Sequence, residues 1–300
     1  MLINSDVDGI ITRIPGWVEA QDLTIEPLEG ITNESYRVAV NGERFVLRIS
    51  RQNTVLLGVD RKAEQAALEA VSRVGIGPEV VHFIDPEGHL VTRYIKGRHW
   101  SPVEYRTPEN LRRIVETVKR LHALPTVKAT FSPFRLAEVY VNRANALQAP
   151  LPDHFDAFMN KMRAIEANRR EDPYSAIGFC HNDLISRNFL DDGTVRILDW
   201  EWAGMGDIYF DLAALVISSI RSSLGPLSPE LQAYVLECYF GEINVVHQAR
   251  LEPMKFMFLL LAALWGVLHH GMVTAGVIPP LEDFNYLQFS ELAFAEARVF

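Results

Sequence analysis

The chain has 300 residues, 48% of them hydrophobic, and a formal net charge of −9 at pH 7. This length corresponds to about two domains or to one protein with two lobes. The negative charge argues against nucleic acid or an anionic membrane surface as the main partner, and it favours a cationic ligand.

Cysteine content and apolar runs bear on the cellular location. Cys180 and Cys238, the two cysteines, lie far apart without ligand-like spacing, so we expect neither a disulfide framework nor a structural zinc site. The first residues, MLINSDVDGI, lack the basic and apolar regions of a signal peptide. The longest apolar run, Phe256–Leu268, is shorter than the roughly 20 residues of a membrane span. We therefore expect a cytoplasmic protein without a membrane span, in which this run is a buried helix.

The N-terminal third of the chain predicts an antiparallel sheet with one helix. Alternating apolar residues around small-residue turns indicate strands, and Asn41-Gly42 is a typical hairpin turn. Apolar residues at helical spacing, followed by Gly75, indicate a helix. The expected strands are Leu23–Leu28, Tyr36–Val40, Arg44–Ile49, Glu79–Ile84 and Leu90–Ile95, and the expected helix is Arg61–Val74.

After residue 96 the pattern changes to helices. Apolar residues recur at helical spacing in three segments, Leu111–Leu121, Phe155–Ala167 and Tyr234–Gly241. We therefore expect an α+β protein with two lobes. A small N-lobe, residues 1–95, is built on an antiparallel sheet, and a larger C-lobe, residues 96–300, is mostly helical.

A polar cluster, HNDLISRNFLDDGTVRILDWEW, occupies residues 181–202. Asp183 is followed by Asn188 five residues later and by Asp199 after eleven more, at the end of an apolar strand. Phosphoryl transfer from a nucleotide requires a carboxylate that accepts the proton of the attacking hydroxyl, and oxygen ligands for Mg²⁺. Asp183 can supply the first, and Asn188 with Asp199 can supply the second.

The alternative for this stretch is a β-hairpin with Asx-turns, because Asp and Asn side chains bond their own backbone in turns. We expect such a turn at Asp191-Asp192-Gly193. The ordered spacing of the other three residues favours chemistry over a turn.

The same stretch resembles a known catalytic loop. HNDLISRN resembles the H-x-D-x-x-x-x-N loop of protein-kinase-like enzymes, and LDW stands where protein kinases have Asp-Phe-Gly. The longer blocks HNDLISRNFL and ILDWEWAGMGDIYFDLA are similar to the choline/ethanolamine kinase family within the aminoglycoside-phosphotransferase-like group. The resemblance implies a protein-kinase-like fold with ATP and Mg²⁺ as cofactors. Its N-lobe would cover the nucleotide phosphates, and its C-lobe would carry catalysis and the acceptor site.

Carried over residue by residue, the resemblance implies specific roles. Asp183 would be the catalytic base, and Asn188 and Asp199 would bind Mg²⁺. Glu201 would be a further acidic group near the metal or the substrate.

Three other polar residues are expected to be structural. His181 would hold the loop, and Asp211 would cap or pin the helix that follows it. His122, in the helix end LHALP, would pack or cap rather than bind a ligand.

The N-lobe would supply groups that hold the nucleotide. The segment LEGITNES resembles the phosphate-covering turn of choline-kinase-like proteins, although Glu29 replaces the first of two glycines. A plain hairpin turn is the alternative. The residues expected to contact the phosphates are Gly30, Thr32, Asn33 and Ser35.

A cation and its partner are also expected in the N-lobe. Arg48, in FVLRIS, stands where protein kinases have a phosphate-binding Lys, and Glu64 on the following helix would be its ion-pair partner. The alternative is that both are solvated surface residues. Backbone groups of the hinge, from Arg93 to Ile95, would bind the adenine ring.

The acceptor site is the least complete part of the resemblance. Aromatic faces bind a quaternary ammonium group, which has no hydrogen-bond donor. The family's late helix usually carries Trp-Gly-x-Trp, and this chain has Trp265 with Leu268 in the second position. The alternative for Trp265 is a core aromatic on a buried helix. The other candidates for this site are Glu201 and Trp202, with Asp207 and Tyr209 as further members.

These observations predict an ATP- and Mg²⁺-dependent phosphotransferase that acts on the hydroxyl of a small cationic amino alcohol, choline or ethanolamine first. A kinase of thiamine or of an aminoglycoside would keep the same catalytic residues and differ in the pocket. The pattern is also compatible with a nucleotide-binding pseudokinase that has a regulatory role and, more remotely, with a metal-dependent hydrolase. The sequence leaves the oligomeric state open.

Overall fold

The computed structural model describes residues 5–28, 33–51, 54–170, 176–217 and 224–300. The helices are α1 (Ser5–Ile11), α2 (Thr54–Leu57), α3 (Arg61–Arg73), α4 (Pro102–Tyr105), α5 (Pro108–His122), α6 (Pro133–Ala146), α7 (Phe155–Arg170), α8 (Ile208–Ile217), α9 (Pro229–Phe240), α10 (Val245–Thr274) and α11 (Tyr286–Ala297), with a 3-10 helix η1 (Ser186–Asn188). The strands are β1 (Leu23–Leu28), β2 (Glu34–Val40), β3 (Glu43–Ile49), β4 (Val80–Ile84), β5 (His89–Arg93), β6 (Ile177–Cys180), β7 (Phe189–Asp191), β8 (Val195–Ile197) and β9 (Gly204–Asp207).

The first five strands form one antiparallel sheet in the order β1-β2-β3-β5-β4. Asn41 and Gly42 have positive φ angles of 50° and 86° between β2 and β3, the conformation that a tight Asn-Gly hairpin turn requires. The five strands expected from the sequence are confirmed, each within two residues of its predicted bounds.

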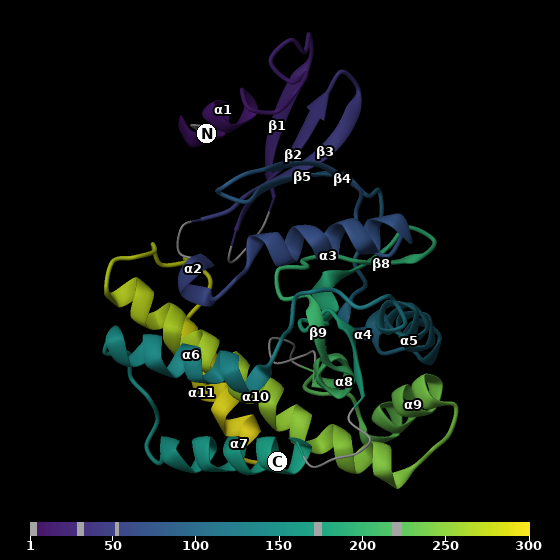
Figure 1. Cartoon of the computed structure of the whole chain (residues 1–300), viewed down its shortest axis with the longest axis vertical. Coiled ribbons are helices and arrows are strands. Elements are labelled where there is room, and N and C mark those ends of the chain that lie inside the picture. Colours follow the sequence, from purple (N-terminus) through teal and green to yellow (C-terminus); the bar gives the residue numbers. More distant parts are fainter. Residues whose placement is uncertain (1–4, 29–32, 52–53, 171–175, 218–223) are drawn as a thin grey trace.

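Helices pack against both faces of this sheet (Figure 1). Phe45 and Leu47 on β3 are buried in a small core with α1, a helix without a counterpart among the predicted elements. Arg48 follows Leu47 in sequence and therefore points to the opposite face, where it meets Glu64 on α3. The α3 helix was expected, and it begins after Asp60, whose side chain accepts two backbone N–H bonds of the first turn.

The C-lobe is mostly helical and forms the broad lower part of the molecule in Figure 1. The three segments with helical spacing are confirmed as parts of α5, α7 and α9. Gly241, with a φ of 84°, ends α9 in the left-handed conformation typical of a helix C-terminus. The two-lobed α+β architecture predicted from the sequence is therefore confirmed.

The α10 helix runs through the core of the C-lobe and packs against α6, α8 and α11. It has 30 residues, so the expected buried helix at Phe256–Leu268 is confirmed but was predicted too short. By length and composition α10 could cross a membrane, yet 78% of its most apolar window is buried inside the protein. Such burial is typical of the core helix of a globular lobe.

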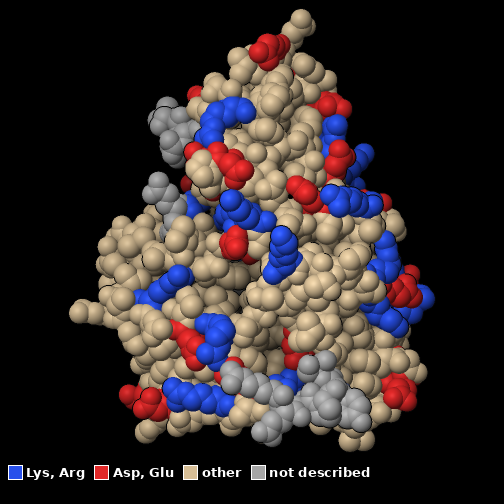
Figure 2. Space-filling view, viewed as in Figure 1, with Lys and Arg blue, Asp and Glu red and all other residues tan. Residues whose placement is uncertain are grey.

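Figure 2 shows Lys, Arg, Asp and Glu side chains of both signs intermixed over one face of the molecule. Several form ion pairs, such as Arg13 with Glu87 at 2.9 Å on the N-lobe surface. Exposed pairs of this kind contribute little to stability.

Two short pairs of antiparallel strands hold the polar stretch that the sequence singled out. β6 pairs with β9, and β7 pairs with β8. The 181–188 loop connects β6 to β7, and residues 198–203 connect β8 to β9. Each loop is thus anchored by a strand at both ends.

Candidate active site

His181 holds the 181–188 loop in shape. Its Nε2–H donates to the carbonyl oxygen of Leu198 at 2.9 Å, and its Nδ1 accepts from the N–H of Asp183 at 3.2 Å. The ring packs edge-on against Trp200, with 4.7 Å between the ring centroids. Burial lowers the pKa of His181, so the imidazole stays neutral and keeps one donor and one acceptor. These are the contacts of a structural residue.

Asp211 on α8 fixes the same loop. Its carboxylate accepts from the backbone N–H groups of His181 at 2.8 Å and Asn182 at 2.6 Å, and it bonds to Nε2 of His122 at 2.9 Å. Asn182 has a φ of 65°, a left-handed conformation that these bonds help to hold. The prediction that Asp211 caps or pins the helix that follows it was therefore wrong. The Asp211 side chain instead holds the 181–188 loop, which precedes it in the sequence.

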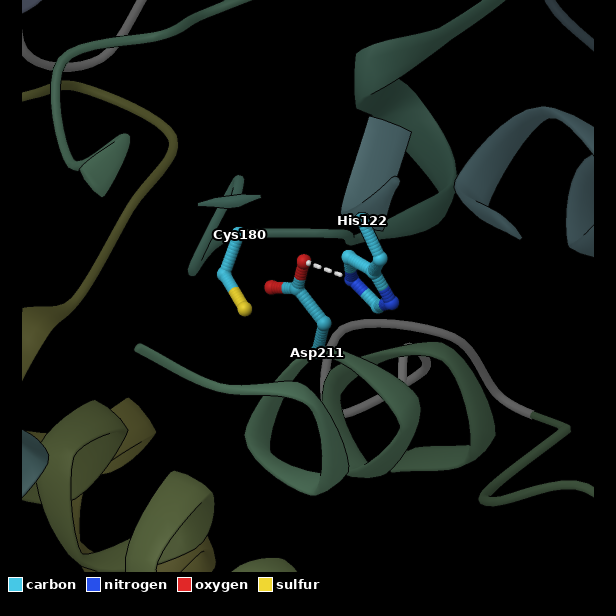
Figure 3. A group of neighbouring side chains, drawn as sticks. All are labelled: His122, Cys180 and Asp211. Atoms are coloured by element: carbon cyan, nitrogen blue, oxygen red, sulfur yellow. Dashed lines mark hydrogen bonds and ion pairs between the residues drawn. The ribbon is translucent and has the colours of Figure 1, made fainter. Parts of the chain in front are cut away.

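His122, Cys180 and Asp211 converge at one point, as Figure 3 shows, and we call them the support cluster. Their potential ligand atoms lie within 4.8 Å of one another, as in a metal site. Each is already bonded within the protein, however, since Nδ1 of His122 bonds to the hydroxyl of Tyr239 at 2.7 Å and the thiol of Cys180 donates to the carbonyl of Gly206 at 3.4 Å. Burial also raises the pKa of the Cys180 thiol, which opposes the thiolate form that metals bind. The support cluster therefore holds the 181–188 loop in place.

Asn188, at the end of η1, lies beside Asp183. Its Nδ2 donates to the backbone carbonyl of Asp183 at 2.8 Å and to Oδ2 of the same residue at 3.0 Å. The amide oxygen Oδ1 remains as the atom of Asn188 that can bind a cation. The backbone carbonyl of Asn188 accepts from the N–H of Leu198 at 2.8 Å, which ties this loop to the segment that carries Asp199.

Asp199 follows β8 with a φ of 64°, a left-handed conformation that residues with a side chain rarely adopt. Strained positions of this kind concentrate at functional sites. Asp199 lines the same cavity as Asp183 and Glu201, and we call these three residues the cavity acids.

The cavity acids have perturbed pKa values. Burial raises the pKa of Asp183 to about 6, and burial with repulsion from Asp199 raises the pKa of Glu201 to about 7. Desolvation by the surrounding protein and repulsion from Asp183 also raise the pKa of Asp199. The Asp199 side chain is exposed to the cavity, and solvent there weakens both effects. A divalent cation would relieve this repulsion, and Mg²⁺ prefers carboxylate and amide oxygens. The donor set of Asp199 and Asn188 therefore fits Mg²⁺.

Arg48 on β3 and Glu64 on α3 form a buried two-point ion pair. Nη1 of Arg48 donates to Oε1 of Glu64, and Nη2 donates to Oε2 at 2.9 Å. The Glu64 side chain has no exposed surface, and the Arg48 side chain is 10% exposed. Burial acts to raise the pKa of Glu64, but Arg48 and Arg61 together hold it below its usual value. The alternative that both residues are solvated is therefore wrong.

The predicted phosphate-covering turn is described only at its end. Gly30 and Thr32 lie outside the described residues. Ser35 lies in β2 directly opposite Arg48 in the register with β3.

Asn33 contacts the C-lobe. Its Nδ2 donates to Oε2 of Glu201 at 3.2 Å, and its Oδ1 accepts from Arg61 at 3.2 Å. The structure thus brings Asn33 to one of the cavity acids, a contact between the lobes that sequence reasoning did not predict.

The hinge residues Arg93–Ile95 are not among the residues that line the cavity. The N–H of Arg93 donates to the carbonyl of Glu79 at 2.9 Å, and the Arg93 side chain pairs with Glu43 at 3.0 Å. The carbonyl of Ile95 accepts from the N–H of Gly97 at 3.0 Å. Adenine binding by the backbone of this hinge stays a prediction.

A cavity of about 490 Å³ opens at the cavity acids and is lined by residues of the C-lobe. Its size is that of a small-molecule site. Carboxylates among aromatic faces suit a cationic ligand. The aromatic residues that line it are Phe131, Tyr140, Trp202, Phe210, Phe258, Trp265, Phe284 and Phe289.

Trp202 and Trp265 both line this cavity. The ring of Trp202 packs edge-on against Phe131, with centroids 6.3 Å apart, and Trp265 packs edge-on against Phe289 at 5.6 Å. Leu268, where the family usually has the second Trp, is fully buried and does not line the cavity. Aromatic residues from other segments surround the cavity instead.

Asp207 and Tyr209 do not belong to this site, so that prediction was wrong. Asp207 pairs with Arg169, and the hydroxyl of Tyr209 bonds to Nδ1 of His247 at 2.8 Å. Neither residue lines the cavity.

Sequence reasoning missed six aromatic residues of the cavity, Phe131, Tyr140, Phe210, Phe258, Phe284 and Phe289. The aromatic density of FNYLQF, residues 284–289, was the available signal.

Two arginines near the cavity acids were also missed. Arg187 lines the cavity, and its charge acts against burial to lower the pKa of Asp183 and Asp199. Arg61, the first residue of α3, bonds to groups of both lobes. Their positions in the sequence did not indicate which way either side chain points.

A small antiparallel lobe over a helical lobe, with a buried Arg–Glu pair above an Asp, Asn and Asp set, defines a protein-kinase-like phosphotransferase. The model of the Phosphotransferase enzyme family matches residues 24–242. The chain therefore belongs to this family.

Known proteins resemble the chain over most of its length. Protein LicA of Haemophilus influenzae is 24% identical over 275 residues, which cover 83% of this chain and 74% of that protein. Probable choline kinase 1 of Arabidopsis thaliana is 29% identical over 211 residues, which cover 65% of this chain and 60% of that protein. The crystal structure of a choline/ethanolamine kinase family protein from Mesorhizobium loti has a TM-score of 0.76 at 25% identity, over 98% of this chain and 93% of that one. The resemblance inferred from the sequence is confirmed.

Proposed function

We propose that this protein transfers the γ-phosphoryl group of ATP to the hydroxyl of a small amino alcohol, choline or ethanolamine, with the help of Mg²⁺. The observation that carries the proposal is one cavity in which three carboxylates lie among aromatic side chains. Aromatic faces would bind the ammonium group, and the hydroxyl would reach Asp183. Similarity to a probable choline kinase and to a choline/ethanolamine kinase family protein supports this substrate class.

Asp183 would orient the acceptor hydroxyl and take its proton. As the acceptor oxygen bonds to the γ-phosphorus, the bond from that phosphorus to the bridging oxygen breaks, and ADP leaves. A carboxylate with a pKa of about 6 is ionised at neutral pH and is still basic enough to accept a proton. The Nδ2 group of Asn188 would keep this carboxylate oriented.

Asn188 and Asp199 would hold Mg²⁺ through the amide oxygen and a carboxylate oxygen. The bound ion offsets negative charge on the phosphate oxygens. The raised pKa of Asp199 supports this assignment, because repulsion from Asp183 contributes to it and a cation would relieve that repulsion.

Arg48 would bind phosphate oxygens from the N-lobe, with Glu64 holding its guanidinium in place. Nε of Arg48 is buried and has no hydrogen-bond partner among the residues that the structure describes. A phosphate oxygen would satisfy this donor. Residues 1–95 would thus cover the nucleotide phosphates, and residues 96–300 would supply the base, the metal ligands and the acceptor cavity.

A cytoplasmic location is part of the proposal. Cys180 and Cys238 are both free thiols, the state that a reducing compartment maintains.

A panel of acceptors tests the proposed function. The protein is incubated with ATP and Mg²⁺ together with choline, ethanolamine, thiamine or kanamycin, while ADP release is followed and products are identified by mass spectrometry. We expect choline or ethanolamine to raise ADP release by about tenfold or more, a difference of at least about 1.4 kcal/mol in activation free energy. If no acceptor raises ADP release above the rate with ATP alone, the proposal is wrong. Preference for thiamine or kanamycin would replace the acceptor class and keep the catalytic assignment.

A further inference from the structure

Arg61 forms hydrogen bonds with three side chains that have different roles in the proposed function. Its guanidinium donates to Oε2 of Glu64 at 2.7 Å, to Oδ1 of Asn33 at 3.2 Å and to Oε2 of Glu201 at 3.4 Å. Glu64 holds the phosphate-binding Arg48, Asn33 follows the predicted phosphate-covering turn, and Glu201 lines the acceptor cavity. The Arg61 side chain is only 12% exposed, so its contacts are largely shielded from solvent.

Glu201 is the C-lobe residue that Arg61 contacts. Asn33 also donates to Oε2 of Glu201, at 3.2 Å, so two N-lobe donors hold the same carboxylate oxygen. The Glu201 side chain is 6% exposed. Because Oε2 is engaged with the N-lobe, Oε1 is the oxygen available to a cation in the cavity.

The contacts between the lobes are suited to forming and breaking. At 3.4 Å the Arg61–Glu201 bond is longer than the 2.7–2.9 Å of a strong charge-assisted hydrogen bond. Nε of Arg61 is buried without a hydrogen-bond partner among the described residues, so its donors are not all committed. The Arg61–Glu64 bond, in contrast, is short and lies within the N-lobe, so Arg61 moves with that lobe.

We propose that Arg61 is a positioning residue that couples the nucleotide-binding N-lobe to the acceptor cavity through Glu201. This inference rests on the proposed function. Nucleotide phosphates draw the N-lobe onto the C-lobe, and Arg61 with Asn33 then fixes Glu201 in the orientation that binds the acceptor's ammonium group. Each ligand consequently tightens the binding of the other, since such a coupling is reciprocal.

Calorimetric titration of the full chain with choline tests the coupling. The dissociation constant of choline is measured alone and with the β,γ-methylene analogue of ATP plus Mg²⁺, at a nucleotide concentration that saturates each variant. For the unaltered protein we expect choline to bind about fivefold or more tightly with the nucleotide, within the usual range of coupling. In Arg61→Met and in Asn33→Leu we expect this ratio to fall to near one. A residue that only stabilises the fold would not change the ratio.

Two comparisons keep the test decisive. Arg13→Met removes an N-lobe arginine whose ion pair with Glu87 is exposed, and it is expected to keep the ratio of the unaltered protein. If Arg61→Met does not fold because buried Glu64 loses a partner, Asn33→Leu decides, since it removes a bond to Glu201 and leaves Glu64 untouched. Unchanged ratios in the folded variants would overturn the inference, as would an unaltered protein that phosphorylates choline but binds it equally well with and without nucleotide. Lack of turnover with every acceptor would instead contradict the proposed function itself.

Discussion

Two polar clusters of the C-lobe meet at the 181–188 loop and differ in how their charges are satisfied. In the support cluster, Asp211 accepts bonds from His181, Asn182 and His122, and the other members are bonded within the protein. The cavity acids face one another, and burial with mutual repulsion raises their pKa values. A cluster that is satisfied internally holds structure, whereas carboxylates that repel one another at a cavity are suited to bind a further cation.

The comparison separates stability from activity. Neutralising a residue of the support cluster removes bonds that the folded state already has, so stability should fall. Neutralising a cavity acid removes repulsion from the folded state and a ligand from the reaction, so activity should fall without loss of stability.

The largest expected effect is on turnover. Asp199→Asn should lower kcat with ATP and choline by about a hundredfold or more, because a carboxylate ligand of the Mg²⁺ site is lost. Asp192→Asn is the matched control, since Asp192 bonds to the nearby Thr194 and Arg196 and does not line the cavity, and its kcat should stay within about twofold. Equal loss in both variants would show that Asp199 has no special role.

The free energy of unfolding should fall with a change in the support cluster and not with a change in the cavity acids. Asp211→Asn should lower the free energy of unfolding by about 3 kcal/mol, because an amide cannot accept all three bonds that the buried carboxylate accepts. Asp199→Asn should leave it unchanged or raise it. Urea denaturation at pH 7 without divalent cations measures both. The distinction between the clusters fails if Asp199→Asn is as destabilising as Asp211→Asn.

A smaller effect is expected at the aromatic wall of the cavity. Trp202→Leu should raise the KM for choline about tenfold, because one aromatic face for the ammonium group is lost, and it should leave the KM for ATP unchanged. The uncharged analogue 3,3-dimethylbutan-1-ol separates charge from shape. The variant should lose most of the preference for choline over this analogue, and a preference retained in full would rule out cation binding by Trp202.

The smallest effect concerns the pH dependence of stability. Because the folded-state pKa of Glu201 is raised to about 7, its ionisation destabilises the folded protein as pH rises from the ordinary value of about 4 through 7. Glu201→Gln should therefore raise Tm by a few degrees at pH 7.5 and by much less at pH 5.5, where Glu201 is already protonated. The difference between variant and unaltered protein is the quantity to measure, because it removes the pH dependence that other titrating groups contribute to both proteins. A difference that does not change with pH would contradict the raised pKa.

The sheet and the grouping of the candidate catalytic residues could be predicted from the sequence because both depend on local order. Asp183, Asn188 and Asp199 lie within 17 residues of chain, between short strands whose apolar pattern is visible. The Arg48–Glu64 pair was expected from the resemblance to kinases, because Arg48 stands where protein kinases have a phosphate-binding Lys, and the structure contains this pair.

The acceptor cavity could not be predicted in the same way. Its aromatic residues come from segments as far apart as Phe131 and Phe289, which helix packing brings together. Asp207 and Tyr209 were wrongly included because they are close to the motif in sequence, although their side chains bond elsewhere. Arg61 was missed because its partners across the lobes depend on how the lobes meet.

The most direct test of phosphoryl transfer by the cavity acids uses ATP labelled in its γ-phosphate, with choline as acceptor. The unaltered protein and Asp183→Asn are compared side by side, and circular dichroism verifies that both are folded. We predict labelled phosphocholine from the unaltered protein and about a hundredfold less or lower from the variant, which lacks the base. Equal amounts of labelled product from the two proteins would contradict the assignment of Asp183 and the mechanism built on it.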